Sequence, residues 1–154
     1  MNISGTLESR KGYCVINGKR IAKGSTSFYW PKTKAKGVKV YYGVDKGWVA
    51  NKKTVAKISR RMLRLSKEGV CIKPIKTVVV KLNLRTKDKK VKKNARGISV
   101  RTMKAAPKRL LPRFRRKLRT ALKKTKTLAK KDFFKAENIM YDPIKKKLQL
   151  VDVT

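Results

Sequence analysis

Alternating apolar and polar residues predict short strands in the N-terminal third of the chain. Residues 13–22 read YCVINGKRIA and place Asn17-Gly18 between two apolar stretches, which is the strongest local signal for a two-residue hairpin turn. The same alternation predicts further strands around residues 28–30 and 38–42, with a Gly-Ser turn at residues 24–27 before them. We expect these segments to form a small antiparallel sheet.

The spacing of apolar residues changes from a strand period to a helix period after Asn51. Val55, Ile58, Met62 and Leu65 recur at helical spacing, which predicts an amphipathic helix over residues 52–68. Asn51 is a suitable N-cap, and Gly69 is a suitable C-terminal stop.

The chain after this helix shows strand patterns again. Residues 70–72 and 77–84 are predicted strands, and residues 97–103 are the predicted partner of the second. The basic segment between them, residues 85–95, is predicted to be an exposed loop.

A second basic helix is predicted over residues 109–131, after Pro107 and around Pro112. One of its faces is apolar: Leu111, Phe114, Leu118, Leu122, Thr125 and Leu128. Two short strands joined by a turn at Asp142-Pro143 are predicted to end the chain. The fold class expected is therefore α+β, with one small antiparallel sheet and two amphipathic basic helices.

Charge is the feature that most restricts the function. The 154 residues carry 45 Lys and Arg against 8 Asp and Glu, a formal net charge of +37. Residues 104–131 alone hold a dense run of cations and no acid, more than solubility requires. Such an excess predicts a polyanionic partner, namely nucleic acid, an anionic membrane surface or an acidic protein surface. Binding to this partner should depend strongly on salt concentration and little on sequence.

The cations of the two helices are the predicted polyanion-binding residues. They are Lys52, Lys53, Lys57, Arg60, Arg61 and Arg64 on the first helix, and Arg109, Arg113, Arg115, Arg116, Lys117, Arg119, Lys123 and Lys124 on the second. Like charges at i, i+3 and i+4 weaken a helix until an anion lies against it.

Other chemistry is limited by residue type. The chain has no His, which excludes imidazole catalysis and leaves almost no zinc ligands. Cys14 and Cys71 are expected to be reduced thiols in or near the core. No apolar run is long enough to span a bilayer, and the first residues lack a secretion segment, so we expect an intracellular protein that is not transmembrane.

The order of elements and several motifs resemble the protein-kinase-like fold. The closest match is KAENIMYDPIKKKLQLVDVT at the C-terminal end, where the resemblance gives Asn138 and Asp152 the role of Mg²⁺ ligands and Asp132 that of the catalytic base. Gly24 and Ser25 occupy the place of the phosphate loop, and Lys39 that of the phosphate-binding lysine. The resemblance implies one truncated domain over residues 1–154, with an N-lobe-like part (1–103) and a part holding the basic helix and terminal hairpin (104–154).

The departures from the kinase pattern favour a protein without catalysis. The predicted phosphate loop has one Gly in place of three, and the predicted helix at 52–68 has no acid inside it to pair with Lys39. Asp132 precedes Asn138 by six residues, where the family uses five. The similarity to small kinase-like proteins of large DNA viruses implies a minor structural component of a virion, within a larger assembly and without a cofactor.

Two other functions stay open at the sequence level. An active protein kinase would use ATP and Mg²⁺ at Lys39, Asn138 and Asp152, with Asp132 orienting the acceptor. An RNA-binding, ribosome-associated protein fits the charge equally well but leaves the C-terminal motif unexplained.

Overall fold

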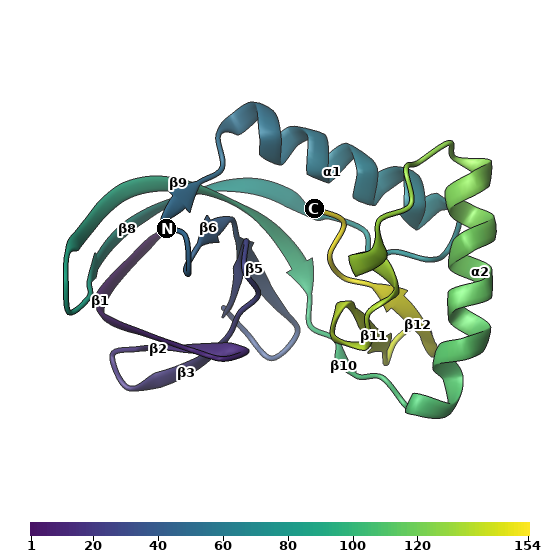
Figure 1. Cartoon of the computed structure of the whole chain (residues 1–154), viewed down its shortest axis with the longest axis horizontal. Coiled ribbons are helices and arrows are strands. Elements are labelled where there is room, and N and C mark those ends of the chain that lie inside the picture. Colours follow the sequence, from purple (N-terminus) through teal and green to yellow (C-terminus); the bar gives the residue numbers. More distant parts are fainter. The chain divides into compact units, whose positions relative to one another are not determined.

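The computed structural model describes all residues from Met1 to Thr154 and has a mixed α+β architecture with two α-helices (Figure 1). The chain forms two compact units. The first comprises Met1–Ala56 and Ile75–Val100, and the second comprises Lys57–Pro74 and Arg101–Thr154. The α+β class expected from the sequence is confirmed, and the mostly antiparallel character of the main sheet is confirmed with it.

The first unit is built on a seven-stranded sheet in the order β3-β2-β1-β8-β9-β5-β4. Its strands are β1 (Asn2–Arg10), β2 (Tyr13–Ile16), β3 (Lys19–Ala22), β4 (Phe28–Pro31), β5 (Lys36–Val40), β8 (Lys76–Arg85) and β9 (Lys90–Arg101). A separate pair joins β6 (Tyr42–Gly43) to β7 (Trp48–Val49). A bridge between Lys23 and Phe28 connects the segments at the two edges of the sheet, so the sheet curls around a core that includes Ile3, Phe28 and Leu82.

The predicted turn at Asn17-Gly18 is confirmed and has a second role. Both residues take positive φ, as this kind of turn requires. The Asn17 carboxamide also reaches β1, accepting from the Thr6 N–H at 3.0 Å and donating to the Ser4 carbonyl at 3.0 Å. Gly5, between those two residues, has φ +137°, and a Cβ there would lie 2.0 Å from Asn17 Oδ1. The hydrogen bonds of Asn17 therefore hold the β2–β3 turn against β1 at Gly5, where a side chain would clash with Asn17.

Two features of this sheet differ from the sequence prediction. Residues 85–95 are not a loop: β8 and β9 continue through most of them as one long hairpin, closed by the Thr86 N–H to Lys89 carbonyl bond. Val91 and Ala95, which lie on the same face of β9, are buried, whereas Lys93 between them on that face is exposed, so the strand pattern is hidden in the sequence by the lysines. The strand β1 was not expected, and it pairs in parallel with β8.

Helix α1 (Lys52–Lys67) follows the prediction closely. Its N-terminus is capped by Asn51 Oδ1, which accepts from the Thr54 N–H at 2.8 Å. At its C-terminus Gly69 has φ +75°, and the Val70 N–H bonds to the Leu65 carbonyl, which is the hydrogen-bond pattern of a Schellman stop. The predicted apolar face is buried.

The second unit contains the remaining elements. They are β10 (Lys104–Ala105), η1 (Lys108–Leu110), α2 (Leu111–Lys124), η2 (Lys131–Phe134), η3 (Ala136–Asn138), β11 (Ile139–Asp142) and β12 (Lys147–Leu150). The three strands form a sheet in the order β10-β11-β12. The predicted terminal hairpin with its turn after Asp142 is confirmed.

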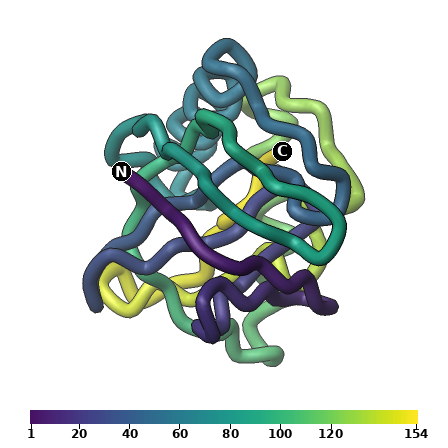
Figure 2. The backbone as a smooth tube through the Cα atoms, turned by 90° about the vertical axis from the view of Figure 1, so that its left-hand side faces the viewer, coloured from purple at the N-terminus to yellow at the C-terminus, as the bar shows by residue number.

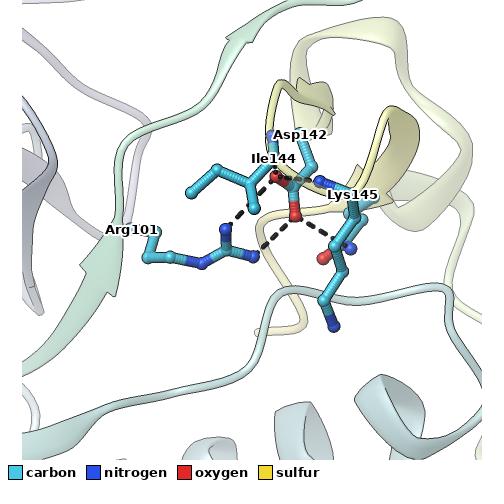
Figure 3. A network of polar contacts seen from close by, with 5 residues as sticks. Arg101, Asp142, Ile144 and Lys145 are labelled. Atoms are coloured by element: carbon cyan, nitrogen blue, oxygen red, sulfur yellow. Dashed lines mark hydrogen bonds and ion pairs between the residues drawn. The ribbon is translucent and has the colours of Figure 1, made fainter.

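A buried carboxylate closes this hairpin (Figure 3). Asp142 is fully buried and accepts from the backbone N–H groups of Ile144 (3.0 Å) and Lys145 (3.1 Å). Arg101 contacts it at 2.6 Å, and the Gln149 amide donates to it at 3.2 Å. Burial raises the pKa of Asp142, but the two backbone donors and Arg101 outweigh burial and leave that pKa below its usual value.

Two predictions for the second unit are wrong in part. Residues 70–72 form no regular strand, and the β-pairing at Cys71 is an isolated parallel bridge to Leu150. The second helix ends at Lys124, because Lys126 takes φ +54° and the Thr127 N–H bonds back to the Leu122 carbonyl. Leu128 therefore lies outside the helix and is 79% exposed.

The remaining expectations for the core are confirmed. Cys14 and Cys71 are buried thiols that form no disulfide. Tyr41 and Tyr42 are fully buried, and Trp30 packs against the core of the first unit, so these three aromatic residues serve packing. No helix is long and apolar enough to cross a membrane.

Candidate polyanion-binding surface

Helix α2 presents one apolar and one cationic face because its leucines recur at helical spacing. Leu111, Phe114, Leu118, Ala121 and Leu122 are buried. The exposed positions between them are almost all basic: Arg113, Arg116, Lys117, Arg119, Lys123 and Lys124. The first turn holds no acid, and the last turn holds Lys123 and Lys124, where cations stabilise the negative end of the helix dipole. We call these six residues the α2 cationic face.

The contacts of the α2 cationic face leave most of its charge uncompensated. Lys124 pairs with Glu68 at 3.2 Å, and the Arg119 guanidinium lies 5.1 Å from the centre of the Phe134 ring. The side chains of Arg113, Arg116 and Lys123 have neither an ion pair nor a hydrogen bond to another protein group. These three cations are therefore the ones best placed to meet an external anion.

Helix α1 carries a second row of cations. Lys52, Lys53, Lys57, Arg60 and Arg64 are exposed, as the sequence predicts. Its first turn contains no acid, and its last turn contains Arg64 and Lys67.

Two of the predicted polyanion-binding residues instead hold the fold together. The Arg115 side chain donates to the Phe134 carbonyl at 2.8 Å, and Arg61 donates to the Val153 carbonyl at 2.6 Å. Both side chains are half-buried. Because each guanidinium satisfies a backbone carbonyl far away in the sequence, replacing it would disturb packing as well as charge.

Like charges meet at Gly69 in the second unit. Lys147 Nζ lies 2.9 Å, and Lys117 Nζ 3.6 Å, from the position that a Gly69 Cβ would take. The pKa of Lys147 is lowered, first by partial burial and then by the charges of Lys117 and Lys145. Sequence reasoning missed Lys147, although it ends the only Lys-Lys-Lys run of the chain, at residues 145–147. An anion here would relieve this repulsion.

The second unit brings the kinase-like residues Asp132, Asn138 and Asp152 to the open end of the β11–β12 hairpin. The Asn138 amide donates to the Asp132 carbonyl at 2.7 Å, and the Val151 N–H donates to the Asn138 carbonyl at 2.8 Å. Asp152 follows directly in the chain.

The carboxylates of these residues already have partners in the chain. Asp152 Oδ1 accepts from the Thr154 N–H at 3.0 Å and from the Thr154 hydroxyl at 2.7 Å. Asp132 pairs with Lys135 at 2.8 Å, and this hydrogen bond raises the pKa of Lys135. No group of three or more His, Cys, Asp and Glu side chains could hold a metal ion.

The other kinase-like residues belong to the first unit. Gly24 begins a turn in which its N–H bonds to the Ser27 carbonyl at 2.8 Å, and Ser25 lies within that turn. Lys39 is on β5, half-buried, with its ammonium group 5.8 Å from the centre of the Tyr41 ring. The turn at Gly24 and the strand under Lys39 are both as the sequence predicts.

Comparisons of the chain with protein-family models, with curated proteins and with solved structures find no match. The kinase-like resemblance therefore stays a prediction, and the chemistry of the surfaces carries the functional argument.

Proposed function

We propose that this protein is a non-catalytic, basic structural protein that binds a polyanion, with nucleic acid as the polyanion that the charge suits best. The observation that carries the proposal is the α2 cationic face, which is exposed and holds three cations without a partner in the chain. A surface of mixed charge would suffice for solubility, whereas a face of six cations with one paired acid attracts phosphate groups and releases their counterions.

The proposal is tested by removing three charges without disturbing the fold. In Arg113→Gln/Arg116→Gln/Lys123→Gln, each new residue is a good helix former at an exposed position. We expect weaker binding to a DNA duplex of about 25 base pairs, and a salt dependence whose logarithmic slope is smaller by about 2.7, or about 0.9 for each lost phosphate contact. Fluorescence anisotropy at several salt concentrations measures both quantities.

A matched variant separates a defined surface from net charge alone. Lys11→Gln/Lys32→Gln/Lys34→Gln removes the same charge from exposed positions of the first unit. The α2 variant should lose more affinity and more slope than this control. Equal losses in the two variants would show that the α2 face is not the binding surface.

The kinase-like scaffold is part of the same proposal, and a packaging role inside a larger assembly such as a virion follows only from that resemblance. The placement of Asp132, Asn138 and Asp152 at one end of the hairpin favours a second candidate, an ATP- and Mg²⁺-dependent phosphotransferase. Calorimetry with ATP and Mg²⁺ at about 0.5 M salt, where charge attraction is screened beyond a few ångströms, decides between them. Binding that requires both Mg²⁺ and Asp152, judged with Asp152→Asn, would replace the structural role by the enzyme.

A further inference from the structure

The outer face of the sheet in the first unit has an unusual composition. Figure 2 shows β1 beside the long β8–β9 hairpin on the near side of the structure, and the three strands are neighbours in the sheet. An open hollow of about 570 Å³ lies over them, and its lining contains no acid. The lining has seven exposed polar residues, of which Lys93 lies opposite the buried Leu82 and so belongs to the other face of the sheet. The remaining six define what we call the amide–lysine face: Asn2, Ser4, Lys81, Asn83, Lys92 and Asn94.

The strand register arranges the amide–lysine face in two rows. Asn2, Lys81 and Asn94 are directly opposite one another across β1, β8 and β9. The next row on the same face consists of Ser4, Asn83 and Lys92. Because neighbouring strands are about 4.8 Å apart, each row spans about 10 Å. Cations and carboxamides thus alternate over a compact area.

The carboxamides are not explained by the stability of the fold. Asn is among the residues that strands disfavour, yet three occupy exposed strand positions in adjacent strands. None of the three side chains forms a hydrogen bond to another protein group, in contrast to Asn17, Asn51 and Asn138. Departures from local propensity without a structural partner are expected where a chain contacts a ligand.

The two residue types suit the two parts of a nucleic acid. Lysine ammonium groups pair with phosphates. A phosphate accepts hydrogen bonds but donates none, whereas each carboxamide offers an acceptor oxygen as well as two donors. The edges of unpaired bases carry both donors and acceptors; in a duplex most of these are used in base pairing.

We propose that the amide–lysine face binds single-stranded nucleic acid, with Lys81 and Lys92 on the phosphates and the carboxamides of Asn83 and Asn94 on base edges. This site is separate from the α2 cationic face and does not depend on it. A carboxamide pairs with several base edges, so the face distinguishes single strands from duplexes rather than one sequence from another.

The first test removes the amides and keeps the charge. Asn83→Thr/Asn94→Thr places good strand formers at exposed positions. Affinity for an unstructured single-stranded DNA of about 20 nucleotides should fall about tenfold, with an unchanged salt slope and unchanged affinity for the matching duplex. An equal loss for single strand and duplex, or no loss for either, would overturn the proposal.

The second test removes the charge and keeps the amides. Lys81→Gln/Lys92→Gln should lower the salt slope for the single strand by about 1.4, or about 0.7 for each phosphate contact. Lys32→Gln/Lys34→Gln, in the exposed turn between β4 and β5, removes the same charge from the same unit and should change the slope less. Equal slopes in the two variants would show non-specific attraction to the +37 protein and would refute the site. The α2 variant should leave the preference for single strands intact, so failure of one proposal is distinguishable from failure of the other.

Discussion

Replacing Asp142 by Asn keeps the shape of a side chain that is fully buried but removes its charge. The Asn carbonyl oxygen can still accept from the N–H groups of Ile144 and Lys145, which contact Asp142 Oδ1 in the native protein. The new NH₂ group would stand where Oδ2 accepts from Arg101 and Gln149, so donors would face donors. The variant thus separates the charge of this site from its volume.

The size of the effect follows from the two hydrogen bonds that are lost with Oδ2. A hydrogen bond to a charged group contributes about 1.5 to 3 kcal/mol and a neutral one about 1 kcal/mol. Arg101 is 29% exposed, so water recovers part of its loss. We expect the free energy of unfolding to fall by about 3 kcal/mol, which lowers the urea midpoint by about 1.5 M at a slope of about 2 kcal/mol per M.

The assay must report on the second unit, where Asp142 lies. Both tryptophans, Trp30 and Trp48, belong to the first unit, so their fluorescence follows the wrong part of the chain. Far-UV circular dichroism at the helix band follows α2 and most of α1. Asp88→Asn, an exposed change of the same charge, should alter stability by less than about 0.5 kcal/mol.

The pH dependence gives a second, independent check. The pKa of Asp142 is lower in the folded chain than in the unfolded chain, so its ionic contribution is full above the unfolded value of about 3.9 and is lost as pH falls through the folded value. The stability difference between the native protein and Asp142→Asn should therefore be constant above about pH 5 and shrink below about pH 4. A difference below about 1 kcal/mol at neutral pH, or one that grows in acid, would refute this reasoning.

Three further predictions follow from the same structure. Gly5→Ala should lower the free energy of unfolding of the first unit by about 3 kcal/mol, because φ +137° strains any side chain and the new Cβ meets Asn17 Oδ1; tryptophan fluorescence in urea measures it, and an unchanged midpoint would contradict it. Lys126→Gly should stabilise the end of α2 by about 0.5 to 1 kcal/mol, because φ +54° is unfavourable for Lys, as seen by circular dichroism against Lys130→Gly. Burial raises the pKa of Cys14 from 9.0 to about 11, so in a Cys71→Ala background its reaction with a disulfide reagent at neutral pH should be at least about 100-fold slower than that of a free thiol, until urea unfolds the chain.

Most helices and strands could be predicted from the sequence because their ends and turns are set by residues within the same short segment. The side chain of Asn51 caps the start of α1, and the positive φ of Gly69 ends it. Positive φ at Asn17 and Gly18 likewise sets the turn of the first hairpin. Lys126 shows the limit of this reasoning. It takes the left-handed position normally given to glycine, so nothing in the residue type indicated where α2 ends.

Long-range pairing explains the other errors. Strand β1 pairs in parallel with β8, about 80 residues away in the chain, and no local pattern specifies such a partner. The β8–β9 hairpin continues through a run of lysines because Val91 and Ala95 face the core, but Lys93 occupies the position of the same face between them, which interrupts the period-2 signal. The same distinction between local and long-range signals applies to the two candidate surfaces. Helical spacing in the sequence predicted the α2 cationic face, whereas the amide–lysine face is recognised only from the strand register, which places Asn83 and Asn94 on neighbouring strands.

The positions of the few acids support the view that the positive charge is directed outward. At least five of the eight carboxylates pair with a Lys or Arg of the chain, among them Asp142 in the buried turn and Glu68 at the end of α1, whereas the pairs of Glu8 and Asp132 are exposed. These pairs use only a small part of the 45 cations. The α2 cationic face receives a single acid, at its Lys124 end, and the lining of the amide–lysine face receives none. Because acids are scarce where the two surfaces are exposed, the charge of these surfaces is balanced by ions from solution, and release of those ions is what would favour the proposed binding of nucleic acid.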